Sequence, residues 1–386
     1  MAINMIKVGI ITATRAEYGL LKPLYLELSK YKNVDCKLIV TGTHLSKKYG
    51  MTVSNIKDDK INIYKKIKII DDIKNENVAD IFSNSVVLFD KLFKKERFDT
   101  IVLLGDRYET LAFAIAAMFN NIPICHIHGG ETTEGAIDEA IRHSITKMSY
   151  LHFTSCEEYK KRVIQLGENP KRVFNVGSLG VENIVKAKLL TKKELCKDLG
   201  LNLDKYFVVT YHPVTLNNNI QMSDFKNLLL ALSAYKDYQV IFTKSNADSG
   251  GNKINSLIDK YVKAHNNVSS FFSLGTKRYL SLVKYSSTVI GNSSSGIIEA
   301  PALLIPTVNV GERQKGRIRV KSIIDCKDDK DSIIKAINRA INFNPSLKFS
   351  DLPFYKNNTS KLIAKKITNV FSKRINLMKK FYDLKV

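Results

Sequence analysis

Side chains that can move protons follow two apolar runs in the first half of the sequence. Asp106 comes two residues after Ile101–Leu104, and His128 and Glu131 come within four residues of the end of Ile122–Ile127. Apolar runs bounded by glycine and polar residues are typical of buried parallel strands. Because ligands of open α/β sheets bind beyond the carboxyl ends of such strands, we expect these three side chains to line a site.

The same stretch continues with two further carboxylates, Glu134 and Asp138. Crowded carboxylates raise the pKa of some members of the group, which suits an acid and a base that work near neutral pH. The sequence therefore predicts proton transfer by Asp106, Glu131 and Asp138. An i,i+4 ion pair between Asp138 and Arg142 is compatible with this role. For Glu134, in a glycine-flanked turn, an ordinary solvated position is the competing interpretation.

Two histidines of this stretch also raise the question of a metal. His126 and His128 are two residues apart on a predicted strand, so both would face the same side of the sheet. With nearby carboxylates they could form a metal site. Because no third ligand has a clear spacing, we predict no metal and interpret His126 as a core residue.

A serine-rich loop, Gly291–Gly296, lies between a predicted strand and a predicted helix. The backbone N–H groups and positive end of such a helix bind phosphate, and hydroxyls add donors. The loop has neither the Gly-Lys-Ser/Thr of a Walker loop nor the dinucleotide glycine pattern, and simple N-capping by serine is the alternative. We predict phosphate binding by the following residues: Ser293, Ser294, Ser295 and Gly296. Glu299, one turn into the helix, is a candidate ribose contact.

Three further residues follow predicted strands. Arg15 comes after the first strand and Arg313 after a late one, so both are candidates to hold a diphosphate, although each taken singly is equally well an exposed surface arginine. His212 ends the first strand of the second half and precedes a proline. There, proton transfer or phosphate contact is as good an interpretation as a structural role.

The elements that must position these residues alternate between strand and helix, which predicts parallel sheets with right-handed crossovers. The pattern relaxes near Gly177–Gly180 and begins again at Phe207–Tyr211. A chain of 386 residues is also too long for one core. We predict an α/β protein with two doubly wound, Rossmann-like domains, residues 1–176 with the carboxylate cluster and residues 177–360 with the serine loop. A basic helix, Leu362–Tyr382, is expected to end the chain.

Composition favours an ordinary globular protein, with 44% apolar and 25% charged residues. We expect a cytoplasmic protein, because no leader or membrane-spanning run is apparent, and reduced cysteines, because the five are scattered. The net charge of +23 would suit a nucleic-acid binder. We prefer a lysine-rich surface that favours an anionic small substrate, because the lysines are spread along the chain in short groups and no zinc-finger spacing or interleaved aromatic motif accompanies them.

Several motifs together resemble one enzyme family, the hydrolysing UDP-N-acetylglucosamine 2-epimerases of bacterial sialic acid biosynthesis. The resemblance runs from about Lys7 to Arg319, with the motifs in the family's order. The motifs are TRAEYG (14–19), GDRYE (105–109), HIHGGE (126–131), IDEAIRHSITK (137–147), YHPVT (211–215), GNSSSGIIEAP (291–301) and GERQKGR (311–317).

This resemblance implies a GT-B fold, with an active-site cleft between the two domains and the C-terminal segment, residues 361–386, returning to the first domain as a helix. It also implies a reaction. UDP-N-acetylglucosamine loses UDP by elimination to 2-acetamidoglucal, and water then adds to give N-acetylmannosamine. No cofactor is implied. The implied partners are the sugar nucleotide and a second or further copies of the chain, as a homodimer or homotetramer.

The resemblance also implies roles for individual residues. Asp106 and Asp138 match catalytic carboxylates of the family, and His212 matches its histidine. In related non-hydrolysing enzymes a glutamate stands where this chain has His128, so we expect Glu131, three residues on, to take over that role. The matched nucleotide contacts are Arg15, the serine loop, Glu299 and Arg313. Arg107, Arg142 and Asn246 complete the predicted substrate contacts.

Alternatives to this function remain open. Relatives that act on UDP- or GDP-N,N'-diacetylbacillosamine, in legionaminic acid biosynthesis, share the same motifs, and the sequence does not separate the two sugars. A GT-B glycosyltransferase is a more distant alternative, which would need an acceptor. A polyanion binder is suggested only by the charge and predicts steeply salt-dependent binding to DNA.

Overall fold

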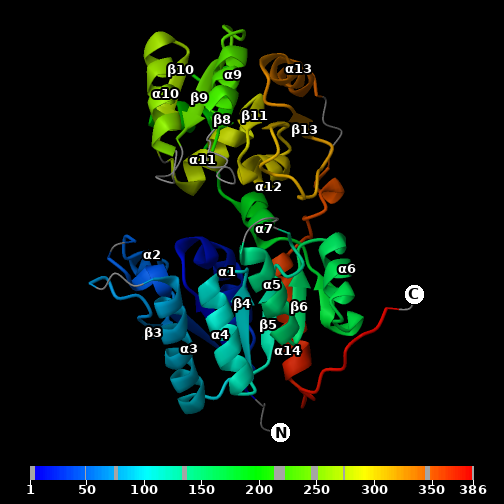
Figure 1. The fold of residues 1–386 in the computed structure, drawn as a ribbon. Helices are drawn as coiled ribbons and strands as arrows, with labels where there is room; N and C mark the ends of the chain where they lie inside the picture. The colour runs from blue at the N-terminus through cyan, green and yellow to red at the C-terminus, as the bar shows by residue number, and fades with distance from the viewer. Residues whose placement is uncertain are drawn as a thin grey trace. The chain divides into compact units, whose positions relative to one another are not determined.

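The computed structural model describes residues 5–47, 49–73, 77–132, 137–212, 222–244, 251–272, 274–343 and 348–384. The chain folds into two compact units. Unit 1 comprises Met1–Asn183 and Pro353–Val386, and unit 2 comprises Ile184–Leu352. Each unit is a parallel sheet covered by helices on both faces (Figure 1). The predicted α/β fold class is therefore confirmed.

Unit 1 is built on a seven-stranded parallel sheet with strand order β3-β2-β1-β4-β5-β6-β7. Its strands are β1 (Ile6–Thr12), β2 (Val34–Thr41), β3 (Ile63–Ile67), β4 (Thr100–Leu104), β5 (Ile124–Ile127), β6 (Leu151–Thr154) and β7 (Val173–Asn175). β4 and β5 are buried along their whole length and β1 at every residue except Lys7, as the apolar runs of the sequence predict.

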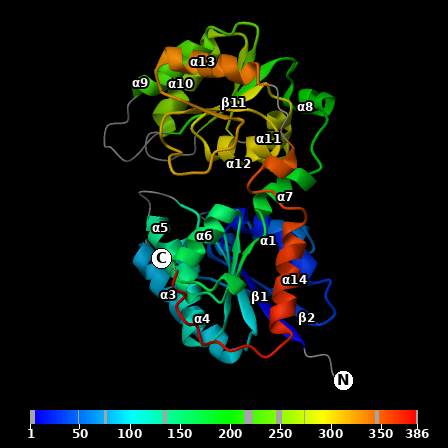
Figure 2. The same cartoon turned by 90° about the vertical axis from the view of Figure 1, so that its right-hand side faces the viewer.

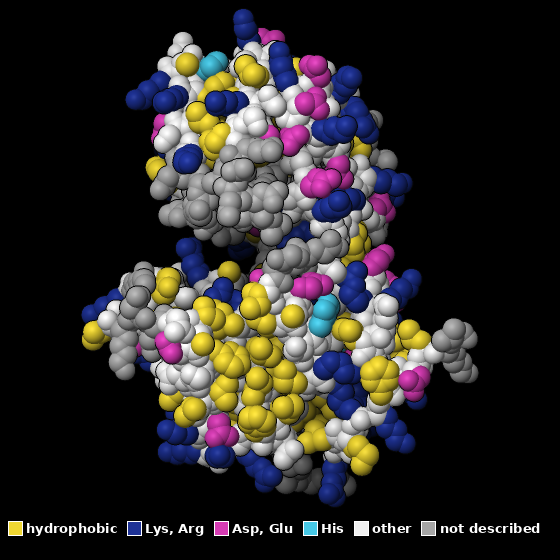
Figure 3. Space-filling view, in the orientation of Figure 1, with side chains coloured by type: hydrophobic (Ala, Val, Ile, Leu, Met, Phe, Trp, Pro, Cys, Tyr) yellow, Lys and Arg dark blue, Asp and Glu magenta, His cyan; other side chains and the backbone are white. Residues whose placement is uncertain are grey.

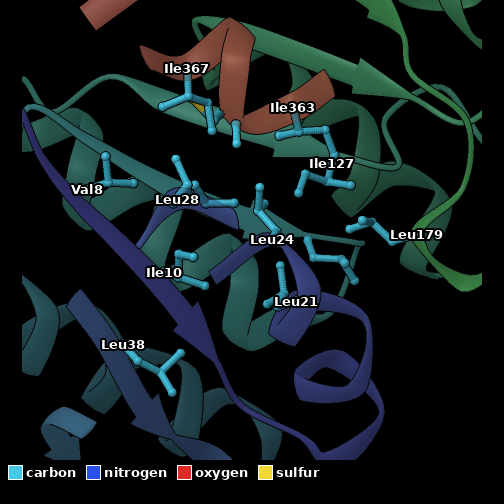
Figure 4. Packing of buried hydrophobic residues seen from close by; sticks show 14 of the residues in the cluster. Val8, Ile10, Leu21, Leu24, Leu28, Leu38, Ile127, Leu179, Ile363 and Ile367 are labelled. Carbon is cyan, nitrogen blue, oxygen red and sulfur yellow. The ribbon is translucent and has the colours of Figure 1, made fainter. Parts of the chain in front are cut away.

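Helices cover both faces of this sheet. They are α1 (Arg15–Leu28), α2 (Val53–Asp58), α3 (Val78–Lys95), α4 (Tyr108–Phe119), α5 (Ile137–Met148), α6 (Glu157–Gln165) and α14 (Thr359–Phe371), with short 3-10 turns at Gly42–Leu45 and Pro170–Arg172. The helix α7 (Leu179–Lys186) begins in unit 1 and ends in unit 2. One core lies under α1 and α14 and the other under α3, α4 and α5. Leu24 and Leu28 of α1 pack in the first core with Ile363 and Ile367 of α14 (Figure 4).

The C-terminal segment differs from its expected form. The helix α14 begins at Thr359 and ends at Phe371, so the predicted helix Leu362–Tyr382 is wrong in its second half. Residues 373–384 are neither helix nor strand. α14 packs against α1 within unit 1 (Figure 2).

Unit 2 repeats the architecture with a six-stranded parallel sheet of order β10-β9-β8-β11-β12-β13. Its strands are β8 (Tyr206–Thr210), β9 (Gln239–Thr243), β10 (Val268–Phe271), β11 (Thr288–Gly291), β12 (Thr307–Val310) and β13 (Ile323–Cys326). Its helices are α8 (Lys192–Leu199), α9 (Met222–Leu232), α10 (Gly251–Ala264), α11 (Gly275–Lys284), α12 (Ser294–Ala302) and α13 (Lys330–Ile341), with a 3-10 turn at Phe349–Asp351.

Both sheets reverse their strand order at one point, between β1 and β4 in unit 1 and between β8 and β11 in unit 2. At such a reversal the connections leave in opposite directions and open a crevice beyond the carboxyl ends of the two strands, where ligands bind. Most of the predicted site residues lie in the loops and first helical turns that follow these strands and their neighbours β5 and β12.

None of the helices in the described ranges is long and apolar enough to cross a membrane. All five cysteines are free thiols, and burial raises the pKa of Cys36, Cys125, Cys156 and Cys326 to about 12. These four thiols are therefore protonated and unreactive near neutral pH, as the sequence predicts for core cysteines.

Candidate active site

An ion pair between Asp106 and Arg142 is the centre of the site in unit 1. Asp106 follows β4, and Arg142 lies in the second turn of α5 with only 5% of its surface exposed. Nη1 of Arg142 also donates to the carbonyl of Glu131, at 2.7 Å, and to the carboxylate of Glu139, at 3.3 Å. One buried guanidinium thus ties together the ends of β4 and β5 and the helix α5.

The backbone turns sharply at the end of β5. His128 has a φ of +68° and Gly130 a φ of +79°, and a Cβ on Gly130 would lie 2.4 Å from the carbonyl oxygen of Tyr159. Only glycine fits such a close approach at a positive φ. The chain therefore leaves the strand at once, and His128 turns out of the sheet although β5 itself is fully buried.

His128 and Glu131 lie side by side beyond this turn. Nδ1 of His128 is 3.7 Å from Oε1 of Glu131, and the hydroxyl of Ser155, after β6, donates to the same oxygen at 2.9 Å. Nε2 of His128 has no hydrogen-bond partner within the described ranges. The sequence analysis did not identify Ser155, which could have been suggested by its place after a buried strand next to β5.

His126 is a core residue, as predicted, and supports the neighbouring loop. It is fully buried, and its Nε2 lies 2.9 Å from the carbonyl oxygen of Gly105. Burial lowers the pKa of His126 to about 3, so the ring is neutral and donates this hydrogen bond. Among the described residues no group of three or more His, Cys, Asp or Glu side chains could hold a metal ion.

Asp138 lies half-buried in the first turn of α5. The i,i+4 ion pair with Arg142, which the sequence offers beside a proton-transfer role, stays a prediction, and the ion pairs seen for Arg142 are with Asp106 and Glu139. The spacing on the helix allows both partners, and the buried guanidinium points towards β4 rather than along the helix surface. The Glu139 carboxylate also lies 3.1 Å from Nε2 of His143, one turn further on.

Two buried carboxylates that the sequence analysis missed flank Arg107. Glu109 is fully buried and holds the guanidinium of Arg107 through two hydrogen bonds of 2.9 and 3.1 Å. Glu17, in the first turn of α1, is 8% exposed, with one carboxylate oxygen 3.9 Å from Arg107. Burial raises the pKa of Glu17 to about 7. Their positions in the TRAEYG and GDRYE motifs were the available signal.

Arg15 is the first residue of α1 and is exposed. It follows β1, the strand next to β4, so its backbone lies at the strand-order reversal of unit 1. The start of α1 is fixed by a capping box in which Thr14 and Glu17 bond each other's backbone N–H groups. An exposed arginine beside a rigid helix start is a suitable anion contact.

In unit 2 the ends of β8 and β11 are locked together through Asn292. Its side chain accepts from the backbone N–H of His212, at 2.7 Å, and donates to the carbonyl of His212, at 2.8 Å. Asn292 is 1% exposed, and the sequence analysis did not single it out. A buried asparagine directly after a strand of this kind is the signal that identifies it. His212 is thereby held at the reversal point.

The serine loop begins the helix α12, as predicted. Ser293 is the N-cap, and its hydroxyl accepts from the backbone N–H of Ser295. The hydroxyl of Ser295 forms a hydrogen bond with the hydroxyl of Tyr279. Ser294 is the first residue of the helix. Gly296 packs closely against Thr307, because a Cβ atom added to Gly296 would lie 2.7 Å from Cγ2 of Thr307. Capping therefore occupies Ser293, and the phosphate-binding role of the loop stays a prediction.

Glu299 and Tyr279 lie next to this loop in a largely buried position. Burial raises the pKa of Glu299, and burial together with the nearby Glu299 raises that of Tyr279 to about 12. A desolvated carboxylate next to a helix start is suited to accept hydrogen bonds from a hydroxylated ligand such as a ribose.

Arg313 follows β12 and is exposed, but its guanidinium donates to the carbonyl of Asn292 at 3.0 Å. Gln314, buried and not predicted, donates to the same oxygen at 3.0 Å. The loop after β12 is thereby tied to the loop after β11. Two residues named in the sequence analysis, Glu134 and Asn246, lie outside the described residues.

Comparison with known proteins decides the family. A family profile described as UDP-N-acetylglucosamine 2-epimerase matches residues 26–368, most of the chain. The chain belongs to this family. The profile spans both units and covers the residues that follow β4 and β5 in unit 1 and β8, β11 and β12 in unit 2, whereas β1 and the start of α1, with Arg15 and Glu17, precede the matched range.

Two curated relatives are similar to this family member over most of their length. It is 41% identical to polysialic acid biosynthesis protein P7 of Escherichia coli over 384 residues, which cover 98% of each chain. It is 44% identical to a Campylobacter jejuni protein named GDP/UDP-N,N'-diacetylbacillosamine 2-epimerase (hydrolyzing) over 324 residues, 83% of this chain and 84% of the relative.

A solved structure shares the fold of this family member. The crystal structure of UDP-GlcNAc 2-epimerase from Neisseria meningitidis, bound to UDP-GlcNAc, matches with a TM-score of 0.76 at 19% identity. The match covers 94% of this chain and all of the other. The protein therefore has the GT-B-like architecture of these enzymes, as the sequence predicts.

Proposed function

We propose that the protein is a hydrolysing sugar-nucleotide 2-epimerase that converts UDP-N-acetylglucosamine and water to N-acetylmannosamine and UDP, the first step of sialic acid biosynthesis. A base removes the proton from C2, the C1–O bond breaks, and UDP leaves with the bonding electrons, giving 2-acetamidoglucal. Water then adds at C1, and a proton returns to C2 on the opposite face. This chemistry needs no metal or redox cofactor and would take place in the cytoplasm.

The observation that carries the proposal is the pairing of Asp106 with the buried Arg142, beside Glu131, at a strand-order reversal in a member of this family. The guanidinium holds the carboxylate of Asp106, the proposed base, in a fixed position. Asp138, in the first turn of the same helix, is the proposed second carboxylate. Because α5 carries Asp138 and also holds Asp106 through Arg142, these two carboxylates can act as acid and base on one carbon from opposite faces.

We assign the catalytic role at the end of β5 to Glu131, with His128 beside it. The hydroxyl of Ser155 orients the Glu131 carboxylate, and the imidazole of His128 lies 3.7 Å from it, so that one water molecule could connect the two groups. Such a pair can pass a proton to or from water during the hydration step.

Unit 2 supplies the proposed nucleotide contacts. The helix start at Ser294 and the hydroxyls of the loop suit the diphosphate, Glu299 suits the ribose, and Arg313 adds a cation. His212, fixed by Asn292, is proposed to assist the departing phosphate. Arg15 and Arg107 are the proposed cations of unit 1. The relative crystallised with UDP-GlcNAc supports this substrate class.

The same reaction on UDP- or GDP-N,N'-diacetylbacillosamine is a second candidate. It is favoured by the 44% identity to the Campylobacter jejuni protein that carries this name. The chemistry at C1 and C2 is unchanged, so the proposed roles of Asp106, Glu131 and Asp138 hold for either sugar.

A proton NMR time course in D2O tests the proposal. With UDP-N-acetylglucosamine, we expect release of UDP and of N-acetylmannosamine that carries deuterium at C2, because the returning proton comes from solvent. The Asp106→Asn variant keeps the side-chain volume but loses the base, so its turnover should fall by about 100-fold or more, with UDP binding retained. Turnover of only the diacetamido sugar nucleotide would select the second candidate. Inertness towards both, or an unaffected Asn variant, would contradict the proposal.

A further inference from the structure

A buried cluster of charges in unit 1 lies away from the carboxyl ends of the strands. Glu168 is 1% exposed, and its carboxylate accepts from Lys147, Lys379 and His152 at 2.7, 2.7 and 3.0 Å. His152 lies near the beginning of β6, so this cluster is at the opposite edge of the sheet from Asp106. Nothing in the proposed reaction uses it.

The C-terminal tail, residues 372–384, provides one of these charges. Beyond α14, Lys379 reaches into the cluster, the ring of Phe381 covers Gly167, and the backbone N–H of Tyr382 donates to the carbonyl of Gly167 at 3.0 Å. A Cβ on Gly167 would lie 2.3 Å from the Phe381 ring. The tail is therefore docked on unit 1 by a charge, an aromatic ring and a backbone hydrogen bond.

Lys379 also closes the C-terminal end of α5. Its ammonium group donates to the carbonyls of Lys147, at 2.9 Å, and Ser149, at 2.6 Å, in addition to Glu168. The last carbonyls of a helix lack partners within the helix, and a cation there is favourable. All three N–H groups of Lys379 are thus used, two of them to hold the end of this helix.

α5 carries Arg142, the partner of Asp106, in its second turn, so this 12-residue helix is held near its middle by Arg142 and at its C-terminal end by Lys379. Between them, the hydroxyl of Thr146 lies 3.3 Å from His126, whose other nitrogen bonds the carbonyl of Gly105, next to Asp106. The helix α5 and the hydrogen bonds from Thr146 through His126 to Gly105 therefore connect the tail to the loop of Asp106.

We infer that the C-terminal tail is a clamp on α5, and that Lys379 is a positioning residue for the Arg142–Asp106 pair. Removing Lys379 leaves Glu168 buried with fewer partners and frees the carbonyls of Lys147, in the last turn of α5, and of Ser149, directly after it. The helix then shifts or frays, and Arg142 no longer fixes the Asp106 carboxylate. The kinetic part of this inference rests on the proposed function, whereas the structural part does not.

The test uses full-length Lys379→Ala, with Lys380→Ala as matched control, because Lys380 is the next residue but exposed. Amide hydrogen exchange, measured by mass spectrometry, should be about tenfold faster than in the wild type in peptides of α5 of Lys379→Ala, and unchanged in Lys380→Ala. The kcat for the sugar nucleotide should fall by about tenfold, since small misplacements of catalytic groups are costly. KM should change less than about twofold, because the proposed nucleotide contacts are elsewhere. Lys379→Arg, which keeps the charge and donors, should restore kcat.

If Lys379→Ala does not fold, Phe381→Ala is the second variant, because it removes the ring that packs on Gly167 and leaves the charges in place. Phe381→Ala should also speed hydrogen exchange in α5 and lower kcat. Faster exchange with unchanged kcat would reduce the tail to a structural anchor and overturn the positioning role. Unchanged exchange in α5 would overturn the clamp itself. A wild-type protein that exchanges as expected but turns over no substrate would contradict the proposed function and leave the clamp standing.

Discussion

Glu17 is a buried carboxylate that is costly to keep in the fold. It is 8% exposed, and although two backbone N–H groups donate to one of its oxygens, the other has no hydrogen-bond partner among the described residues. Glu109 occupies the nearby guanidinium of Arg107. A carboxylate retained at this cost, at the reversal point of the sheet, indicates that the site benefits from its negative charge.

Glu17→Gln should stabilise the protein more at pH 8 than at pH 5. Burial raises the pKa of Glu17 from 4.5 to about 7, so the folded state binds this proton more tightly than the unfolded state. Stability from this group is full below pH 4.5 and declines as the pH rises to 7. Glutamine never ionises and avoids this loss, which amounts to about 3 kcal/mol at most. Urea unfolding of both proteins at the two pH values measures the difference.

Glu194 provides the matched control for this measurement. It also occupies the third position of a capping box, with Thr191, but on the exposed helix α8, where hydrogen bonds from Thr191 lower its pKa. Glu194→Gln should therefore have the opposite sign, losing stability above pH 4.5 and none in acid. If Glu17→Gln follows this control instead, the Glu17 side chain ionises freely and its charge is not costly to the fold.

The role of a single residue was predictable from the sequence where its position after a strand identifies it. It was not predictable where the role depends on how deeply the side chain is buried and on its neighbours. Asp106 and Glu131 follow apolar runs, so their shared sheet edge could be inferred. The positions of Glu17 and Asn292 were visible in the same way, but their roles could not be inferred, because the desolvation of one and the reciprocal hydrogen bonds of the other with His212 depend on neighbours distant in the sequence.

At the scale of elements, alternation of strand and helix was enough to predict two parallel sheets. The end of α14 was not predictable from the same pattern. The apolar residues of the tail recur at helical spacing, but Phe381 covers Gly167 and Lys379 enters a buried charge cluster, and both contacts require the chain to leave the helix. Tertiary contacts outweigh the weak helical preference of the tail.

Gly291, the last residue of β11, should not tolerate alanine. Its φ is +134°, and a Cβ would lie 1.9 Å from the carbonyl oxygen of Thr210 on β8. Gly291→Ala must push the two strand ends apart and break the Asn292–His212 hydrogen bonds. We expect a loss of at least about 2 kcal/mol in stability and, if UDP binds at this loop, a weakening of about tenfold. Chemical unfolding and calorimetric titration with UDP measure the two effects.

Gly311→Ala is the control at the same sheet edge. Gly311 has a φ of +72°, but a Cβ there meets no atom within 4 Å. Its substitution should cost only the backbone strain, about 1 kcal/mol, with little effect on UDP. Equal effects of the two substitutions would show that the close approach of β8 and β11 is not what fixes the loop.

For the whole molecule, the charge of +23 opposes self-association unless an uncharged face is available. Unit 1 has such a face. Apolar side chains gather over α3 and α4 (Figure 3), where Val87 is 50% exposed, Met118 46% and Phe119 65%. Exposed apolar patches of this kind mark interaction sites. We propose that a second copy of the chain covers this apolar face of α3 and α4. If the same face of both copies forms the contact, apolar surface meets apolar surface and most lysines stay apart.

Replacing Val87 and Phe119 together by glutamate should therefore halve the molecular mass in sedimentation equilibrium at micromolar concentration. In a dimer of this variant, the two introduced carboxylates of each copy would be buried against the same carboxylates of the other copy. This burial makes the free energy of association less favourable by several kcal/mol per dimer. The control is Leu230→Glu, on α9 of unit 2, which is 56% exposed and lies outside this face; its mass should equal that of the wild type. Both variants should retain the wild-type circular dichroism, since the substituted side chains are at least half-exposed. A wild-type protein already monomeric, or a double variant of unchanged mass, would contradict association through α3 and α4.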